Sequence, residues 1–275
     1  MVMKVYDRSD TMDVKAVGRK LDRKVKKDDR LTDVKTAGRT LELFEAFADS
    51  QEPLSLSELG RALKAPLSSS LYLVRALEGR GYLYTLTERR QIYPTRKMFD
   101  IAKSIMVREP GMEQIEPMLI GLRDSTQETV ILGKRQGNRV VYLAVFEGPR
   151  AIRYTARTGD LKPLHSSSLG KALLSALNPP ERAKAVAKLT HDAITPKTIT
   201  DRNALLKELE RAAARGYSET RGEHVKDVMA IGKPVWLGKE LYGVAIAGPL
   251  HRMSADVSKH VVQLNSTCAA IAEQG

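Results

Sequence analysis

The amino-acid sequence predicts an α+β protein with two domains, a smaller helical one followed by a larger one in which helices alternate with strands. Three observations support this prediction. The chain has 275 residues, which is enough for two domains that each bury a core. Hydrophobic residues make up 42% and charged residues 28%, the balance of a globular protein. The spacing of apolar residues also changes near Met112, where strand-like segments begin to alternate with helical ones.

The first domain is expected to contain a helix-turn-helix. Ser55 and Glu58 have the spacing of a capping box, in which each side chain satisfies a backbone N–H, so a helix should begin at Leu56. It should end at Lys64–Ala65, because Pro66 disfavours helical geometry in the residue before it. Pro66 suits the first turn of a second helix. Two short helices joined by a tight turn are typical of a helix-turn-helix.

The second of these helices is predicted to have two unlike faces. Its apolar residues are expected to form one buried stripe, made of Leu67, Leu71, Val74 and Leu77. The other side carries hydroxyls, a phenol and a guanidinium, as in a helix that reads DNA; a helical hairpin that binds nothing is the alternative. The candidate DNA-binding residues on this helix are Ser68, Ser69, Ser70, Tyr72 and Arg75.

A β-hairpin is expected to follow, with strands at Tyr82–Tyr84 and Gln91–Tyr93 around a turn at Thr87–Arg90. Such a hairpin forms a wing, with Arg89 and Arg90 at its tip, where they can reach phosphate or a minor groove. A further helix ahead of the pair is predicted from the helical spacing of Ala37, Leu41, Phe44 and Ala48. Together these elements predict a winged helix-turn-helix domain over residues 31–95.

The segments on either side of this domain carry separate predictions. Residues 1–30 alternate basic residues with aspartates and predict a disordered or loosely ordered basic tail, with an electrostatic DNA arm as the alternative. Residues 96–110 predict a linker helix with an apolar side, which packs either on a second subunit or on its own domain. The residues on that side are Met98, Ile101, Ala102 and Ile105.

Residues 111–275 predict an α+β domain with an antiparallel sheet and helices on its faces. Helices are expected at Met112–Asp124, at Ser168–Leu177, from Pro179, between Asp201 and Gly216, and from Ser254, the last burying Val257, Val261, Leu264, Cys268 and Ile271. Strands are expected at Thr129–Lys134, Val140–Phe146, Ala151–Thr155, Val228–Leu237 and Glu240–Ala247.

Composition narrows the kinds of partner. A net charge of +12 and a pI near 9.7 favour a polyanion. The lone Cys268 excludes a disulfide framework. The chain has no apolar run of membrane-spanning length and no signal-peptide core, so we expect a cytoplasmic protein with no membrane partner. Its five histidines lack metal-binding spacing, and neither a metal nor a cofactor is expected.

Several blocks of sequence then identify a family. They are S-L-S-E-L-G-R-A-L-K-A-P-L-S-S-S (55–70), R-G-Y-L (80–83), G-D-L-K-P-L-H-S-S-S-L-G-K-A-L-L (159–174), R-G-Y-S (215–218), E-H (223–224) and A-I-A-G-P-L-H-R (245–252). By the order and spacing of these blocks, the chain from about Leu31 onward resembles the IclR family of bacterial transcriptional regulators.

The resemblance implies a DNA-binding winged helix, a dimerising linker helix and a C-terminal, GAF-like effector-binding domain for a small organic molecule, often a carboxylic or aromatic acid from a catabolic pathway. The effector-binding positions it implies are Leu164, His165, Ser166, Ser167, Ser168, Gly170, Thr220, Glu223, His224, Val228, Ala230, Ala245 and Ala247. The residues themselves fit an anion, because a loop that enters a helix at Ser168 presents N–H groups and hydroxyls; an ordinary N-cap cluster is the alternative. Apolar neighbours favour an aromatic acid.

Departures from the family pattern bear on specificity and on chemistry. Tyr72 stands where the family often has Arg, so a guanine-reading fork is absent there. Lys226 and Lys233 either pair with a ligand carboxylate or are solvated charges. Ser168 and Lys171 have the S-x-x-K spacing of some serine hydrolases, but the S-D-N and K-T-G elements that accompany it are missing.

The sequence thus predicts a regulator that is not an enzyme, a repressor of a catabolic operon. It would bind double-stranded operator DNA as a homodimer and respond to a small organic effector. The family resemblance also implies a homotetramer built from two dimers. The alternatives are an activator of the same family, a small-molecule-binding protein whose winged helix contacts protein, and a serine hydrolase that uses Ser168 and Lys171.

Overall fold

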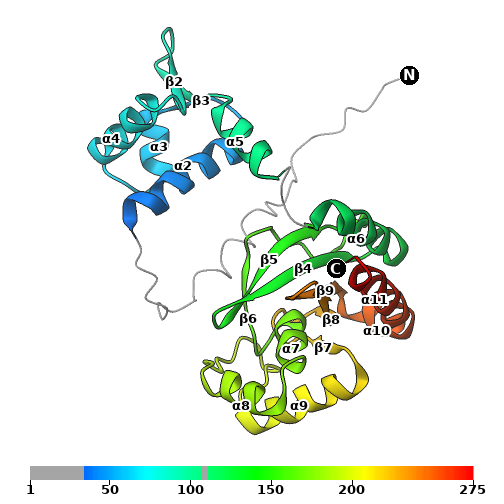
Figure 1. Cartoon of the computed structure of the whole chain (residues 1–275). Coiled ribbons are helices and arrows are strands. Elements are labelled where there is room, and N and C mark those ends of the chain that lie inside the picture. Colours follow the sequence, from blue (N-terminus) through cyan, green and yellow to red (C-terminus); the bar gives the residue numbers. More distant parts are fainter. Residues whose placement is uncertain (1–33, 107–110, 275) are drawn as a thin grey trace, which may run out of the picture. The chain divides into compact units, whose positions relative to one another are not determined.

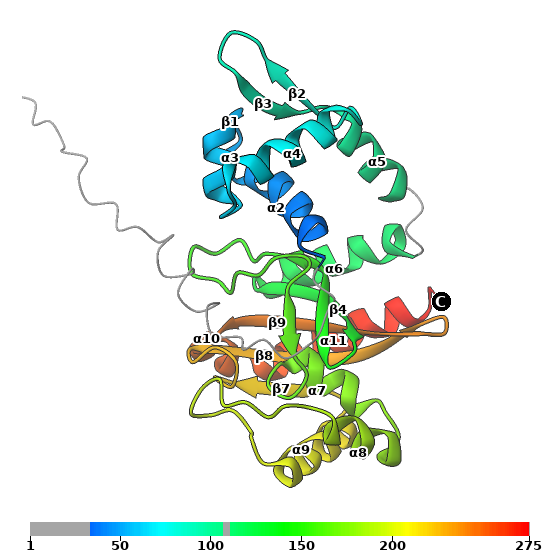
Figure 2. The same ribbon diagram turned by 90° about the vertical axis from the view of Figure 1, so that its left-hand side faces the viewer.

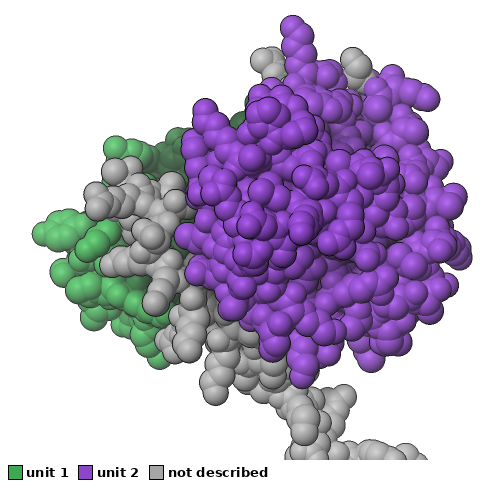
Figure 3. Space-filling view, turned by 90° about the horizontal axis from the view of Figure 1, so that it is seen from below, with its two compact units in different colours: residues 1–107 green, residues 108–275 purple. Residues whose placement is uncertain are grey.

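The computed structural model of the protein describes residues 34–106 and 111–274 (Figure 1). The tail expected over residues 1–30 and the end of the expected linker helix lie outside the described residues. The chain divides into two compact units, residues 1–107 and 108–275 (Figure 3). In the described part of the chain, no helix is long and apolar enough to cross a membrane.

The first unit is a winged helix-turn-helix, as predicted. Its elements are α2 (Lys35–Ser50), β1 (Leu54–Ser55), α3 (Leu56–Ala62), α4 (Leu67–Glu78), β2 (Leu83–Leu86), β3 (Gln91–Pro94) and α5 (Lys97–Met106). The three strands form an antiparallel sheet in the order β1-β3-β2, and the β2–β3 hairpin is the wing (Figure 2).

The predicted capping box is present at the start of α3. The Ser55 hydroxyl accepts a hydrogen bond from the Glu58 N–H (3.3 Å), and the Glu58 carboxylate accepts one from the Ser55 N–H (2.8 Å). Both N–H groups would otherwise lack a partner at a helix start, so the motif defines where α3 begins. The pKa of the Glu58 carboxyl is lowered by the hydrogen bond from the Ser55 N–H and by a second one that the Ser55 hydroxyl donates to the same carboxylate (2.7 Å).

The prediction of which side of α2 is buried is wrong: the buried side is rotated by part of a helical turn from the expected one. Leu43 and Phe47 are buried, whereas Leu41 is 64% exposed and Phe44 is half-buried against Tyr82. Residues three and four apart always share a helix face, so two neighbouring apolar stripes fit the same spacing. The positions of α3, α4 and β3 decide which stripe is buried.

The predicted stripe of α4 is also partly wrong. Leu67 is 53% exposed, and Ser70 is buried in its place beside Val74 and Leu77. The Ser70 hydroxyl donates a hydrogen bond to the Pro66 carbonyl (3.2 Å). A hydroxyl that bonds the carbonyl four residues earlier in a helix is satisfied locally, which lets a polar side chain occupy a core position.

The second unit is an α+β domain with a six-stranded antiparallel sheet, in the order β6-β5-β4-β9-β8-β7. Its strands are β4 (Thr129–Gln136), β5 (Arg139–Phe146), β6 (Leu161–Pro163), β7 (Ser218–Arg221), β8 (Val228–Leu237) and β9 (Glu240–Pro249). Its helices are α6 (Met112–Thr126), α7 (Ser168–Ser175), α8 (Pro179–Ala187), α9 (Arg202–Arg215), α10 (Leu250–Ala255) and α11 (Val257–Ala272). The predicted fold class is therefore confirmed.

Helices cover both faces of this sheet (Figures 1 and 2). Alternating side chains along the strands build a core on each face. Leu132 and Ile246 pack with α6, α10 and α11, whereas Ile131 and Ala245, their neighbours in sequence, pack with α7, α8 and α9. The face toward α7 is lined at its centre by small residues, Ala230, Ala245 and Ala247. Small side chains at the middle of a packed face leave room for a cavity.

Three elements of this unit differ from the prediction. Ala151–Thr155 is not a strand, and the strand that pairs with β5 is β6. β7 was not predicted, and the last helix starts at Val257 after a separate short α10. Apolar alternation marks residues that can form a strand, but a strand also needs a neighbour with unpaired backbone groups, and the sequence does not show which segment reaches that edge.

Candidate functional site

A small cavity lies between the sheet and α7 in the second unit. Its volume is about 30 Å³. Most of the effector-binding positions expected from the sequence line it, namely Ser167, Ser168, Thr220, His224, Val228, Ala230, Ala245 and Ala247. Four further residues that were not expected from the sequence complete the wall, namely Ile131, Tyr142, Tyr154 and Val225.

The N-terminus of α7 borders this cavity. Ser167 is its N-cap, and its hydroxyl accepts a hydrogen bond from the Gly170 N–H (3.1 Å) and donates one to the Pro163 carbonyl (2.6 Å). The Ser167 side chain is thus the ordinary cap that was weighed as the alternative. Ser168, the first residue of the helix, lines the cavity next to it. The helix dipole at this end favours negative charge.

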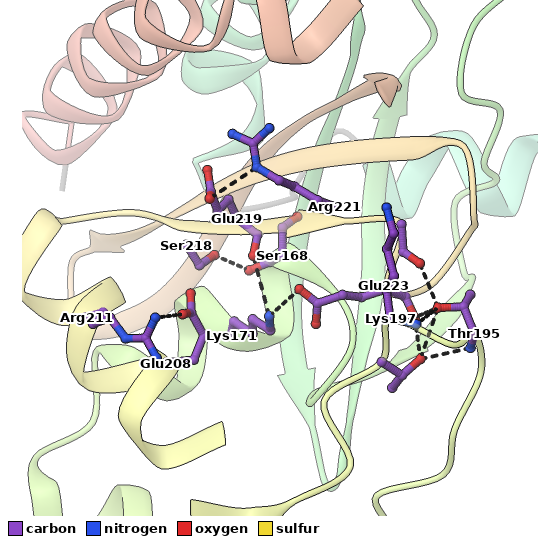
Figure 4. A network of polar contacts seen from close by, with 12 residues as sticks. Ser168, Lys171, Thr195, Lys197, Glu208, Arg211, Ser218, Glu219, Arg221 and Glu223 are labelled. Carbon is purple, nitrogen blue, oxygen red and sulfur yellow. Dashed lines mark hydrogen bonds and ion pairs between the residues drawn. The ribbon is translucent and has the colours of Figure 1, made fainter. Parts of the chain in front are cut away.

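A buried ion pair holds one wall of the cavity in place (Figure 4). Lys171 is 1% exposed, and its Nζ donates a hydrogen bond to Glu223 Oε1 at 2.7 Å. Glu223 itself does not line the cavity, but the next two residues, His224 and Val225, do. Burial raises the pKa of the Glu223 carboxyl, and the attraction of Lys171 opposes that rise.

The segment that carries Glu223 is also tied from its other side. The Thr198 hydroxyl donates to the Glu223 carbonyl (2.7 Å), and the Thr195 hydroxyl donates to the Gly222 carbonyl (2.7 Å) (Figure 4). Ion pair and threonines together fix both the backbone and the side chain of Glu223. This segment therefore presents His224 and Val225 to the cavity from a rigid support.

Several positions expected to bind the effector are instead buried beside the cavity. Leu164 belongs to the core, and Gly170 packs so closely on the Leu164 backbone that a Cβ would not fit. The His165 ring stacks on His191, with ring centroids 5.8 Å apart, and its Nε2 lies 3.1 Å from the Asp192 carbonyl oxygen. Burial lowers the pKa of His165. The full set of expected positions that do not line the cavity is Leu164, His165, Ser166, Gly170 and Glu223.

The four cavity residues that were not expected from the sequence differ in whether any sequence pattern could have identified them. Ile131 and Tyr142 lie on strands that were predicted, but alternation shows only which residues share a face of a strand and not that this face meets α7. Val225 follows directly on Glu223 and His224, but it had no motif of its own. Tyr154 lies in the segment that was wrongly assigned to a strand, so its direction could not be inferred.

The lysines considered for ligand or enzyme chemistry have other partners. Lys233 Nζ donates to the Gly216 carbonyl (3.1 Å), at the end of α9. Lys226 is exposed and does not line the cavity. Because the Lys171 amine is engaged by Glu223, it is not placed as a base for Ser168. Within residues 34–106 and 111–274, no group of His, Cys, Asp or Glu side chains is arranged to hold a metal ion.

The first unit presents the expected polar face of α4. Ser68, Tyr72 and Arg75 are exposed, Tyr72 by 72%, and Ser69 is half-buried. Arg89 and Arg90 are exposed in the turn of the wing. Ser70 is a correction: it was proposed as a DNA-binding residue, but it is 1% exposed and faces the core, so it does not belong to this surface.

Comparison with known proteins agrees with this architecture. Residues 36–87 match the IclR helix-turn-helix domain, and residues 106–272 match the C-terminal domain of bacterial transcriptional regulators of the IclR type. The HTH-type transcriptional repressor AllR of Klebsiella pneumoniae is 29% identical over 220 residues, covering 79% of this chain and 81% of AllR. AllR of Escherichia coli K12 is 26% identical over the same shares.

Solved structures show the same fold. The IclR protein of Thermotoga maritima has a TM-score of 0.73 and 23% identity, covering 87% of this chain and 98% of that one. An IclR homologue from Microbacterium hydrocarbonoxydans, complexed with 4-hydroxybenzoate, has a TM-score of 0.68 and 21% identity, covering 87% and 98%. The matching domain families and the AllR relatives are transcriptional regulators rather than enzymes. The interpretation as a serine hydrolase is therefore without support. The chain belongs to the IclR family of bacterial transcriptional regulators.

Proposed function

We propose that this regulator is a ligand-responsive repressor of a catabolic operon, which binds operator DNA through its first unit and a small organic acid through its second. The observation that carries the proposal is the cavity at the N-terminus of α7, where residues from five strands, from the start of α7 and from two loops of the second unit meet. AllR is a repressor, which supports repression rather than activation for this regulator. An activator of the same family is the alternative.

The chemistry of the cavity supports an acid or a close derivative. Ser168, Thr220 and the two tyrosines offer hydroxyl groups, and the first turn of α7 offers its positive end. Ser167, His224 and the alanine, valine and isoleucine side chains cover the remaining wall. This mixture suits a molecule with one polar and one apolar end. The homologue complexed with 4-hydroxybenzoate supports an aromatic acid as the narrower form of the proposal.

We assign DNA binding to residues 31–95, with 96–110 as a linker and 111–275 as the effector-binding domain. On α4, Ser68, Ser69, Tyr72 and Arg75 would face base edges, because a recognition helix enters the major groove. In the wing, Arg89 and Arg90 would contact phosphate. The regulator acts where the chromosome lies, so we place it in the cytoplasm.

The first test is a gel-shift and footprinting experiment on the DNA beside the protein's own gene, at low and near-physiological salt with random DNA as competitor. A discrete footprint with two-fold symmetry is expected, because two copies of a helix-turn-helix read two half-sites. Binding that disappears equally on every sequence with salt would mean only the attraction of a basic protein for DNA, and would overturn the proposal.

Two variants separate the proposed roles on DNA. Tyr72→Ala should weaken operator binding with little change on random DNA, because its contact reads sequence. Arg89→Ala should weaken binding to both and reduce the salt slope by about one, since it removes a single phosphate contact. Equal losses of both variants on both DNAs would contradict this assignment. A reporter gene under the operator then distinguishes repressor from activator by the sign of its response to deletion of the regulator.

A further inference from the structure

A groove on the first unit, which we call the α2–α4 groove, lies between the first turns of α2 and one side of α4. Its volume is about 330 Å³, and apolar side chains such as Leu63 and Leu73 form part of its wall. The polar residues that bear on its function are Thr36 and Arg39 of α2 and Ser69 and Tyr72 of α4. The groove therefore borders the polar face of α4.

Arg39 lines this groove without a counter-charge. It is half-buried, and among the described residues no carboxylate pairs with it. Glu42, three residues later in α2, is exposed and does not line the groove. Arginine side chains are seldom withdrawn from water unless an anion faces them. The groove thus has a place for a negative charge that the described part of the chain does not supply.

The groove also carries hydroxyl groups that are free to bind a ligand. The side chains of Thr36, Ser69 and Tyr72 form no hydrogen bond with any other described residue. Ser70, by contrast, donates its hydroxyl to the Pro66 carbonyl (3.2 Å). A guanidinium and free O–H donors, in a wall with no acidic side chain, suit an anion that has several oxygens.

The neighbouring surface indicates which anion this is. Ser69 and Tyr72 belong both to the groove and to α4, the helix that a helix-turn-helix places in the major groove of DNA. The two strands that border a major groove carry a phosphate at every nucleotide. Arginine suits phosphate, because its fork of N–H groups can bond two oxygens at once. Charge and position together favour a phosphate of the DNA backbone.

The groove and the wing lie at opposite ends of the first unit. Figures 1 and 2 both show the first turn of α2 at one end, the β2–β3 hairpin at the other end and α4 between them. Arg89 and Arg90 are exposed in the turn of that hairpin. Cations on both sides of α4 match a duplex whose two strands flank the helix in the major groove.

We propose that the α2–α4 groove binds one phosphate of the DNA backbone, with Arg39 as the charged contact and the Thr36 hydroxyl as a hydrogen-bond donor. The inference rests on the proposed function, in that α4 is taken to enter the major groove. It extends the DNA-binding surface to α2, which the residues assigned on α4 and in the wing leave out. Contacts at both ends of the unit would fix the orientation of α4 on the duplex, because phosphate contacts position a protein whereas base contacts specify the sequence.

The test follows binding of the full-length protein to a fluorescently labelled random duplex by anisotropy over a series of salt concentrations. Arg39→Gln should reduce the slope of the logarithm of the association constant against the logarithm of salt concentration by about 0.9, because one phosphate contact is lost. Arg39→Lys keeps the charge and should keep the native slope. Thr36→Val loses a donor but no charge, so it should weaken binding about two- to tenfold with the slope unchanged.

Arg211→Gln is the matched control for the lost charge. Arg211 lies in α9 of the second unit, its side chain is 68% exposed, and the variant should keep the native slope. The double variant Arg39→Gln/Arg89→Ala should lose about twice the slope of either single variant, because the two arginines contact different phosphates. A native slope in Arg39→Gln, or an equal loss in Arg211→Gln, would overturn the proposal.

Thermal unfolding shows whether Arg39 has a structural role instead. Arg39→Gln should keep the native thermal midpoint, because no described residue pairs with this side chain. A lowered midpoint together with an unchanged salt slope would mean that a segment of the chain itself covers the groove, and this result would contradict the phosphate site.

The outcomes also separate this inference from the proposed function. A discrete operator footprint together with a native salt slope in Arg39→Gln would reject the phosphate site and leave the regulator's function intact. Conversely, the expected loss of slope on random DNA, in a protein that shows no sequence-specific footprint, would support the phosphate site and refute the proposed operator.

Discussion

At the scale of single residues, the buried Lys171–Glu223 pair is a costly feature of the second unit. Removing two charges from water costs several kcal/mol for each ion, and only close geometry offsets it. The 2.7 Å contact between Lys171 Nζ and Glu223 Oε1 supplies that geometry. Because Lys171 belongs to α7, the contact anchors this part of the cavity wall to that helix. The same pair also explains why Lys171, although next to the cavity, does not line it.

Breaking this pair from one side should be strongly destabilising. Lys171→Met is expected to lower the free energy of unfolding of the second unit by about 3 to 5 kcal/mol, because the Glu223 carboxylate is left buried without a counter-charge. The double variant Lys171→Met/Glu223→Leu should regain most of that loss. Urea unfolding followed by circular dichroism measures both.

The control for this prediction is an exposed pair of the same kind. Lys134 and Glu240 lie 2.6 Å apart, with side chains 36% and 61% exposed. Lys134→Met should cost less than about 1 kcal/mol, since exposed pairs contribute little. Similar losses for Lys134→Met and Lys171→Met would show that burial does not govern the contribution of Lys171.

At the scale of elements, the position of α7 depends on one close contact between its first turn and the preceding loop. Gly170 lies in its first turn, where the Leu164 backbone leaves no space for a Cβ. This contact lets the loop at 164–167 fold back against the helix and brings Ser167 and Ser168 to the cavity. The family resemblance implied Gly170 as a binding position, but in the structure its role is to let this loop and helix pack.

A single methyl group tests this packing. Gly170→Ala should destabilise the second unit by about 1 to 3 kcal/mol or more, because the added Cβ overlaps backbone rather than a movable side chain. Gly121→Ala, in α6, is the matched control, since no atom lies within 4 Å of its added Cβ. It should stabilise the protein by about 0.5 to 1 kcal/mol. Equal effects on the thermal midpoint would contradict the packing argument.

At the scale of the whole molecule, the exposed apolar residues of α5 are where we expect a second copy of the chain to bind. None of its residues is buried within the described chain, and Phe99, Ile105 and Met106 are 55%, 68% and 62% exposed. Burying apolar surface of this kind against a second copy is favourable. A symmetric operator needs two winged helices at a defined spacing, and a helix that follows the wing is well placed in the sequence to pair them.

A charge on this helix tests that expectation, because it should keep two copies of the chain apart. Ile105→Glu is expected to shift the protein from dimer to monomer in analytical ultracentrifugation and to remove the footprint, because a carboxylate in an apolar interface is costly. Ser104→Glu adds the same charge at the neighbouring exposed position and should leave both properties unchanged. A dimer that persists in Ile105→Glu would place the interface elsewhere.

By itself, the sequence determined the elements whose signals are local. The capping box at Ser55 and Glu58, the Asp201 cap and the Gly216 end of α9, and the β8–β9 hairpin all lie where the sequence predicts them, because each depends on residues a few positions apart. The ordered family blocks likewise sufficed to identify the regulator family.

Only the tertiary structure decided which faces and which loops meet. Leu41 and Leu43 fit helical spacing equally well, and the packing of α2 on its neighbours chose Leu43. Ser70 was assigned to the DNA surface and proved to be core. Tyr154 reaches the cavity because Thr129, 25 residues earlier, holds its backbone. Contacts between residues distant in sequence carry no local pattern, so the make-up of the cavity wall follows from the fold and not from any motif.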